Sequence, residues 1–292
     1  MISPHPVTKI CIVGGGFGGL YTALKLEQLP WPGEQKVEIT LIDKSDRFIF
    51  LPLLYELVTG EMQTWEVAPS FAELLGSTAI RFVQGEVSKI DVNRQEIRLT
   101  NRQTLDYDRL VIGVGGCTPT GNIPGVMDYA IPFRTVDDAH RLKEKLRLLE
   151  LNNPDKIRVA IVGGGYSGVE LACKISDRLG KVGRVRVIDR GPTILKQADD
   201  FNRQSAEEAL QKRQVWIDYE TEVTELTQDT ISLLFRGEVD PIPVDLVLWT
   251  VGNDVSPLIK ELDLKKNDRG QLYTNPYLQL DRNPEIFALG DG

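Results

Sequence analysis

The sequence predicts an α/β fold of two similar domains, the second inserted in the first. Two observations support this prediction. A short β-branched strand that runs directly into glycines and then a helix occurs twice, and each copy is followed by a second strand that ends in an acid. The glycines begin at Gly14 and Gly163, an offset of 163 − 14 = 149 residues. A chain of 292 residues has room for both units.

In the first copy the strand covers 10–13, and glycines follow with the spacing G-x-G-x-x-G at Gly14, Gly16 and Gly19. The first glycine permits a tight turn, the second lets a pyrophosphate approach the backbone, and the third allows close packing of the helix. The N-terminus of that helix offers N–H groups and a positive dipole end to phosphates. The next strand ends at Asp43, which can accept from both hydroxyls of an adenosine ribose.

The second copy has glycines at Gly163, Gly165 and Gly168, a following strand at 185–188, and Asp189 at its end. Either copy alone could be an ordinary glycine-rich turn at the end of a strand. Two copies, each with its acid, instead indicate two Rossmann-like domains that bind two dinucleotides and pass electrons between them.

Composition limits the partners. The chain has 34 Lys and Arg against 42 Asp and Glu, a net charge of −8, so it predicts no nucleic-acid partner. No apolar run approaches the length of a membrane span, which predicts a cytoplasmic chain. Cys11, Cys117 and Cys173 show neither a close pair nor metal-ligand spacing, so no metal site is predicted. We expect Cys11 and Cys173 to be small buried residues.

Between the two copies the pattern predicts a helix over 66–75, a turn-rich crossover over 118–125, and a helix over 135–151 ended by Asn-Asn-Pro at 152–154. Four short stretches of alternating residues lie between the helix over 66–75 and the crossover. They predict one meander of strands that caps the first domain: 80–83, 86–92, 96–100 and 105–106. After the second copy, the pattern predicts a helix over 199–213, strands near 215–219 and 231–235, a buried strand over 245–252 that ends in glycine, and an apolar strand in the segment 284–292.

Two predicted buried strands are each followed by glycine, where the backbone can pass close to a cofactor. Gly115 follows the strand in the first half, and Gly252 follows its counterpart in the second half. The last strand ends in a Gly-Asp pair at Asp291.

Together these motifs resemble those of the two-dinucleotide-binding-domain flavoproteins. Within them, the stretches 50–54 and 163–170 resemble the type II NAD(P)H:quinone oxidoreductases. The stretches 31–33, 47–60 and 65–69 look most like the cyanobacterial and plastid branch that reduces demethylphylloquinone and related prenylated quinones. The resemblance covers essentially the whole chain.

The resemblance implies that residues 1–118 and 251–292 form an FAD-binding domain and residues 119–250 an NAD(P)H-binding domain. A hydride would pass from NAD(P)H to FAD, and electrons would then pass to a prenylated quinone. The residues implied at FAD are Gly14, Gly16, Phe17, Gly18, Gly19, Asp43, Lys44, Gly115 and Asp291. Those implied at NAD(P)H are Gly163, Gly165, Tyr166, Ser167, Gly168, Asp189, Arg190 and Gly252.

Glu170 is the one catalytic side chain that the resemblance implies, with its carboxylate toward the contact between nicotinamide and flavin. The alternative is an acid in the first helical turn that only stabilises the helix dipole. Because the cofactors carry the chemistry, no catalytic histidine is needed, and we expect His5 and His140 to be surface residues.

Coenzyme preference stays open, because Asp189 favours the ribose 2′-hydroxyl of NADH while Arg190 can pair with the 2′-phosphate of NADPH. The family also continues past the Gly-Asp motif into a C-terminal region that docks on the inner face of a plasma or thylakoid membrane. That region is not in this sequence, so peripheral membrane association is an expectation from the resemblance, and a homodimer is left open.

Other functions use the same fold. A disulfide reductase or a sulfide:quinone reductase needs a pair of cysteines near the flavin, which this sequence does not predict. A reductase of a ferredoxin- or rubredoxin-type protein remains an alternative, as does a non-catalytic redox-sensing flavoprotein. Turnover with quinones separates these alternatives.

Overall fold

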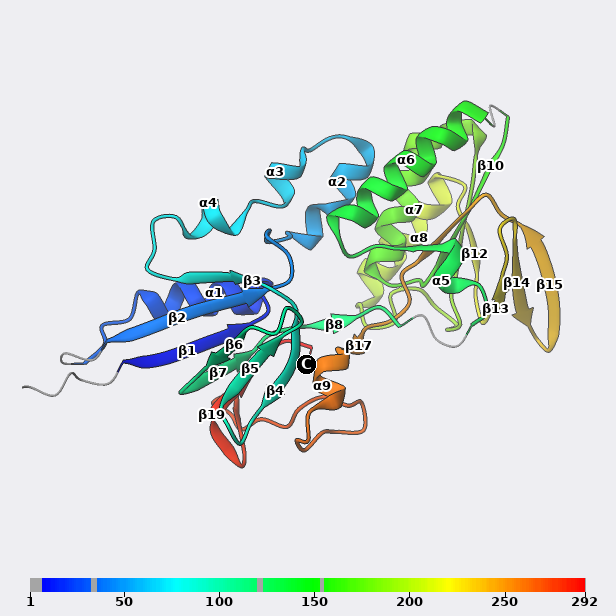
Figure 1. Cartoon of the computed structure of the whole chain (residues 1–292). Helices are drawn as coiled ribbons and strands as arrows, with labels where there is room; N and C mark the ends of the chain where they lie inside the picture. The colour runs from blue at the N-terminus through cyan, green and yellow to red at the C-terminus, as the bar shows by residue number, and fades with distance from the viewer. Residues whose placement is uncertain (1–6, 33–35, 120–122, 153–154, 292) are drawn as a thin grey trace, which may run out of the picture. The chain divides into compact units, whose positions relative to one another are not determined.

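The computed structural model describes residues 7–32, 36–119, 123–152 and 155–291. Its contacts divide the chain into two compact units. Unit 1 comprises Met1–Phe50, Ala68–Cys117 and Asn253–Gly292, and unit 2 comprises Leu51–Val67 and Thr118–Gly252. Each unit contains a mainly parallel sheet with helices on it (Figure 1), so the predicted α/β class is confirmed. His5 and parts of the predicted crossover and helix end, 120–122 and 153–154, lie outside the described residues.

Unit 1 is built on a six-stranded sheet. Its order is β18-β19-β7-β1-β2-β3, with only β18 antiparallel to its neighbour. The strands are β1 (Thr8–Val13), β2 (Val37–Asp43), β3 (Arg81–Gln84), β7 (Arg109–Ile112), β18 (Gln279–Leu280) and β19 (Asn283–Ala288).

Both faces of this sheet are buried, as its nearly continuous apolar strands require. Ile10 and Ile12 of β1 pack with α1 (Phe17–Glu27) and α4 (Phe71–Leu75). Their neighbours Cys11 and Val13 face the opposite way, toward the antiparallel strands β4 (Val87–Asp91), β5 (Glu96–Leu99) and β6 (Thr104–Asp106).

The prediction of one four-stranded meander is wrong for its first stretch. Residues 81–84 form β3, which pairs in parallel with β2 from Thr40 opposite Arg81. The reason is burial on two sides: the ring of Phe82 stacks on that of Phe71 at 4.6 Å, whereas Val83 belongs to the core on the other face. Only β4, β5 and β6 form the meander.

The single helix predicted over 66–75 is also wrong, because the chain forms α3 (Thr64–Val67) and then α4. Pro69 between them has no N–H to donate, which interrupts a helical ladder. Ser70 then caps the new helix: its Oγ accepts from the Glu73 N–H at 3.2 Å, and the Glu73 carboxylate accepts from the Ser70 N–H at 3.0 Å.

Unit 2 repeats the arrangement with an all-parallel sheet of order β12-β11-β10-β16-β9. Helix α7 (Tyr166–Leu179) packs on β10 and β11, and an antiparallel three-stranded sheet buries apolar residues against β10, β11 and β16. The parallel strands are β9 (Ala130–Pro132), β10 (Ile157–Val162), β11 (Gly183–Ile188), β12 (Trp216–Asp218) and β16 (Leu246–Trp249). The antiparallel strands are β13 (Glu222–Leu226), β14 (Thr230–Phe235) and β15 (Glu238–Pro243).

A segment from the first half of the sequence completes unit 2. Helix α2 (Leu54–Thr59) follows the short helix η1 (Leu51–Leu53) and lies beside α6 (Val136–Asn152) and α7 (Figure 1). The buried ring of Tyr55 stacks on that of Phe133 at 5.2 Å. The predicted helices over 135–151 and 199–213 are confirmed as α6 and α8 (Asp200–Lys212).

The remaining elements are short: α5 (Val126–Tyr129), α9 (Pro257–Glu261), η2 (Gly180–Val182), β8 (Gly116–Cys117) and β17 (Asp254–Val255). Across the described ranges, every helix falls short of the length and apolarity that a bilayer span requires.

Candidate functional site

The two glycine loops have nearly the same geometry. Gly14 has φ +101° and Gly163 has φ +113°, in the region that L side chains rarely adopt. A Cβ atom on Gly14 would lie 2.4 Å from the carbonyl oxygen of Gly113, and one on Gly163 would lie 2.8 Å from Oγ1 of Thr250. The first glycine of each motif is therefore required by both backbone conformation and space.

The third glycines bring each helix against its own loop. A Cβ atom on Gly19 would lie 1.8 Å from the carbonyl oxygen of Gly14, and one on Gly168 would lie 1.8 Å from that of Gly163. Backbone atoms cannot move aside as a side chain can, so these positions admit only hydrogen.

The middle glycines are different, because they border open space. Gly16 and Gly165 are the N-cap residues of α1 and α7, with extended backbones and no side-chain cap. No atom lies within 4 Å of a Cβ built on either residue. The first-turn N–H groups of each helix lack intrahelical partners. Each loop thus leaves space that a side chain would fill, beside donors suited to phosphate, which fits a dinucleotide in both units.

The acid at the end of each second strand has a role that the sequence did not reveal. Oδ2 of Asp43 accepts from the Gly15 N–H at 2.6 Å, and Oδ1 accepts from the Ser45 N–H at 2.8 Å. Asp189 repeats this with the Gly164 N–H at 2.6 Å and the Gly191 N–H at 2.7 Å. Each carboxylate holds its glycine loop in place. Its oxygens keep further lone pairs, so acceptance from a ribose stays a prediction.

A cavity of about 150 Å³ lies beside the first acid, within unit 1. Gly14, Asp43 and Lys44 line it, as do residues 85–87 and Leu258. Residues 85–87 were not predicted at the site from the sequence. Their signal is topological, since Gly85 follows β3 at the same sheet edge as Asp43, and its N–H donates to the Asp43 carbonyl at 2.8 Å.

The other residues predicted at FAD lie as follows. Phe17 is 48% exposed, with its ring 5.1 Å from that of Phe48. A Cβ on Gly18 would lie 2.1 Å from Cδ1 of Leu289, so the segment leading to Asp291 lies against the first loop. Asp291 itself is exposed. Gly115 has φ +63° and open space at its Cβ position.

In unit 2, Tyr166 is exposed at the first position of α7, and the Oγ of Ser167 accepts from the Tyr55 hydroxyl at 3.2 Å. Arg190 is exposed and makes no hydrogen bond or ion pair with the described residues. Gly252 has φ +64°, with Pro119 3.5 Å from its Cβ position.

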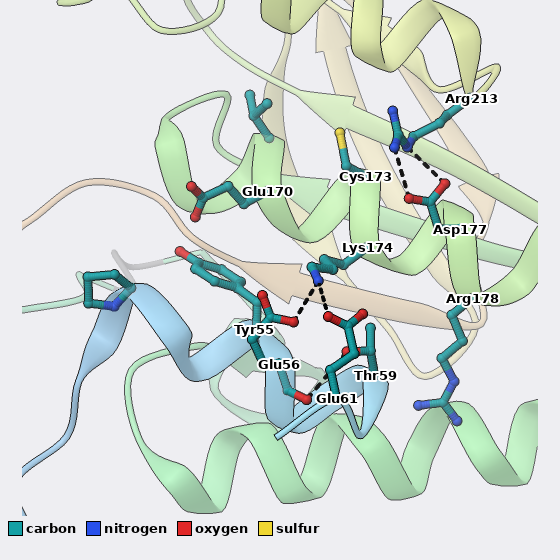
Figure 2. Close-up of a pocket in the computed structure, with 12 residues that line it drawn as sticks. Tyr55, Glu56, Thr59, Glu61, Glu170, Cys173, Lys174, Asp177, Arg178 and Arg213 are labelled. Carbon is teal, nitrogen blue, oxygen red and sulfur yellow. Dashed lines mark hydrogen bonds and ion pairs between the residues drawn. The ribbon is translucent and has the colours of Figure 1, made fainter. Parts of the chain in front are cut away.

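Glu170 is the fifth residue of α7, because the helix begins at Tyr166. Its predicted place in the first helical turn is therefore wrong, and a role limited to stabilising the helix end loses its basis. The side chain is exposed and lines a groove of about 650 Å³ along α7. In Figure 2 its carboxylate lies on the side of the groove near the hydroxyl of Tyr55.

Tyr55 connects this region to the glycine loop and was not predicted. The side chain is only 8% exposed. Burial raises the pKa of Tyr55 to about 12; the hydrogen bond to Ser167 opposes this rise and the nearby charge of Glu170 adds to it. Tyr55 therefore stays a neutral hydroxyl donor at physiological pH.

The cysteines carry no disulfide. Cys11 is buried as predicted, and burial raises its pKa to about 11. Cys173 is only partly buried and lines the groove, so the prediction that it is buried is wrong. In the described part of the chain no three His, Cys, Asp or Glu side chains are grouped to hold a metal. His140 is exposed as predicted and lies 3.1 Å from Oγ1 of Thr64.

Comparison with known proteins agrees with this geometry. The model of the pyridine nucleotide-disulphide oxidoreductase family matches residues 8–292. Demethylphylloquinone reductase NdbB of Synechocystis sp. is 55% identical over 288 residues, 97% of this chain and 71% of that protein. Alternative NAD(P)H-ubiquinone oxidoreductase C1 of Arabidopsis thaliana is 41% identical over 97% of this chain and 61% of that protein.

Among solved structures, NDH2 from Plasmodium falciparum in complex with NADH superimposes with a TM-score of 0.82. The match covers 98% of this chain and 64% of that one, at 23% sequence identity. At this identity the likeness supports the fold.

Proposed function

The chain belongs to the pyridine nucleotide-disulphide oxidoreductase family, in the branch that includes NdbB, and on this premise we propose that it is an FAD-dependent NAD(P)H:quinone oxidoreductase. The observation that carries the proposal is the duplicated loop, which leaves space beside a helix N-terminus once in each unit. When both cofactors are bound, they supply hydride transfer from nicotinamide to flavin and electron transfer onward.

In this proposal unit 1 holds FAD. Its first loop and the N-terminus of α1 bind the pyrophosphate, Asp43 binds the adenosine ribose, and Asp291 binds the ribityl or phosphate part. Unit 2 holds NAD(P)H through the second loop, Asp189 and Gly252. The proposed cofactor-binding domains, 1–118 with 251–292 and 119–250, differ from these units in residues 51–67, 118 and 251–252, which lie in unit 2.

Glu170 is proposed to act on the dinucleotide held by unit 2. With NAD(P)H bound, the Glu170 carboxylate would stabilise the positive charge that develops during hydride transfer. Tyr55, Ser167 and Glu170 come from two segments that meet at the start of α7, which orients the polar groups at this end of the groove.

Glu170→Gln keeps the shape of the side chain and removes its charge. We expect flavin reduction by NAD(P)H to slow about tenfold, equivalent to about 1.4 kcal/mol of transition-state stabilisation, with flavin content nearly unchanged. Anaerobic stopped-flow absorbance measures both quantities. An unchanged rate would leave Glu170 without a role in the reaction.

Coenzyme choice depends on Asp189 and Arg190. The acid repels a 2′-phosphate, whereas the exposed guanidinium of Arg190 is free to contact one, an interaction worth roughly 1.5–3 kcal/mol. We therefore expect both coenzymes to be used. Arg190→Ala should shift the ratio of kcat/KM toward NADH by about tenfold or more, and Asp189→Ala should shift it toward NADPH. The ratio is obtained from steady-state rates with each coenzyme. An unchanged ratio in Arg190→Ala would show that Arg190 does not contribute to coenzyme choice.

The quinone proposed is a prenylated one of the demethylphylloquinone or plastoquinone type, because NdbB is named for demethylphylloquinone and is 55% identical. Such a substrate resides in a bilayer, so we propose a cytoplasmic protein associated peripherally with the inner face of a plasma or thylakoid membrane.

The test is oxidation of NADH and NADPH by the complete protein with a panel of prenylated quinones. Turnover with quinone supports the proposal. A reductase of a ferredoxin- or rubredoxin-type protein would reduce only the protein acceptor, and a redox sensor would bind both cofactors without sustained turnover.

A further inference from the structure

Helix α7 carries an acid and a base at the spacing that usually pairs them. Glu170 and Lys174 are four residues apart, with the acid nearer the N-terminus, the orientation that favours an ion pair on a helix surface. The pair does not form in this structure. Nζ of Lys174 instead lies 2.6 Å from Oε2 of Glu56 and 2.9 Å from Oε2 of Glu61.

We call Glu56, Glu61 and Lys174 the lysine clamp. Figure 2 shows the ammonium group turned toward the two carboxylates and away from Glu170. The side chains of Glu56 and Lys174 are 20% and 28% exposed, so solvent screens this pair less than a surface pair. Burial lowers the pKa of Lys174, but the hydrogen bonds that its ammonium donates to Glu56 and Glu61 outweigh it and raise the pKa overall.

The other cations of the groove are also occupied. The Arg213 guanidinium donates two bonds of 2.9 Å to Asp177, and that of Arg178 donates bonds of 2.8 and 2.9 Å to Glu150. Cys173, one turn from Glu170, has its pKa raised by burial and is a neutral thiol. Among the described residues that line the groove, Glu170 is the acid that is not paired with a cation.

We infer that the lysine clamp is a positioning device that holds the Lys174 ammonium away from Glu170, so that no cation compensates the charge of the Glu170 carboxylate beside the dinucleotide site. This inference rests on the proposed role of Glu170. Glu56, Glu61 and Lys174 act through Glu170 and need not touch substrate.

The alternative partner for a released lysine is four residues away on its own helix. α7 also carries Asp177, three residues beyond Lys174, but Arg213 already holds that carboxylate. If the two clamp acids were neutral, Glu170 would therefore be the acid on α7 that has no cation and that Lys174 can reach. The ion pair would compensate the carboxylate and weaken its attraction for a developing positive charge.

The test compares three forms of the complete protein: wild type, Glu56→Gln/Glu61→Gln, and the same double variant with Lys174→Met added. The first readout needs no cofactor. In protein labelled with ¹³C at glutamate carboxyls, the Glu170 resonance, assigned by its loss in Glu170→Gln, is titrated with pH. We expect the double variant to titrate lower than the triple variant by roughly half a pH unit or more.

The second readout is flavin reduction by NAD(P)H in stopped flow. The double variant should be slower than wild type by roughly two- to fivefold, the effect of one partly exposed ion pair, and the triple variant should recover, because no cation is left to pair with Glu170. A general packing defect would not be repaired by a third substitution. Glu61→Gln alone, at a side chain 57% exposed, provides a variant with little risk to folding, and it should change both readouts in the same direction by less.

Equal titration of Glu170 in the double and triple variants overturns the clamp, whatever the kinetics. If the titrations differ as expected but Glu170→Gln reduces flavin at the wild-type rate, the clamp stands and the proposed role of Glu170 fails. The two ideas therefore fail separately.

Discussion

Replacing Gly16 with valine should abolish flavin binding while the protein still folds. The backbone of Gly16 is extended, with φ −69° and ψ −167°, which any L residue can adopt, and nothing lies within 4 Å of its Cβ position. The new side chain would therefore meet no protein atom and would occupy the space proposed for the pyrophosphate. We expect purified protein to retain less than about a tenth of the wild-type flavin absorbance, since steric exclusion leaves no partial binding mode.

Gly165→Val is the matched control. Its backbone has φ −77° and ψ −176° and its Cβ position is equally open, so any cost of a poorer helix cap is shared by the two variants. It should keep flavin and raise the KM for NAD(P)H by about tenfold or more. Flavin lost from Gly165→Val and kept in Gly16→Val would mean that the two cofactor assignments are reversed.

The second large effect concerns stability. Gly168→Ala places a Cβ atom 1.8 Å from the carbonyl oxygen of Gly163 and 3.1 Å from Oγ1 of Thr250. Relief requires α7 to move off its strand, so we expect unit 2 to lose roughly 3 kcal/mol or more of unfolding free energy. Thermal unfolding followed by circular dichroism should show a midpoint lower by roughly 6–12 °C.

Gly165→Ala, three residues earlier in the same motif, tests this reasoning. Open space surrounds its Cβ position, so only the poorer helix cap, which costs about 1 kcal/mol, should lower its unfolding midpoint, by roughly 2–4 °C. Gly19→Ala should behave like Gly168→Ala, since its Cβ would also lie 1.8 Å from a loop carbonyl. A midpoint of Gly168→Ala equal to that of Gly165→Ala would contradict the tight helix–loop contact.

The sequence was most informative where the chain repeats a local device. Strand, glycine turn and helix are specified within about 20 residues, so β1 with α1 and β10 with α7 follow from spacing alone. Local sequence signals were less reliable where packing partners distant in the sequence determine which sheet a strand joins. The stretch 80–83 alternates like a meander strand, but partners on both faces place it in the parallel sheet.

The candidate site shows the same division. Spacing placed Asp43 and Asp189 at strand ends, but it could not show that their oxygens already accept backbone N–H groups, because that depends on loop geometry. The lysine clamp joins Glu56 to Lys174 across 174 − 56 = 118 residues. Nothing local to either residue indicates the contact, and Lys174 by itself suggests a helix pair with Glu170 instead.

The order of strands in unit 1 has a consequence for synthesis of the chain on the ribosome. Strand β7, which ends at Ile112, pairs on one side with β1 and on the other with β19, which begins at Asn283. The ribosome adds 283 − 112 = 171 residues between the end of β7 and the start of β19. At roughly 5–20 residues per second this takes about 9–34 s, and that edge of β7 stays unpaired for this time. An open apolar strand edge can recruit strands of other chains, so slower translation or chaperone depletion should lower the soluble yield of this protein by leaving unit 1 incomplete for longer.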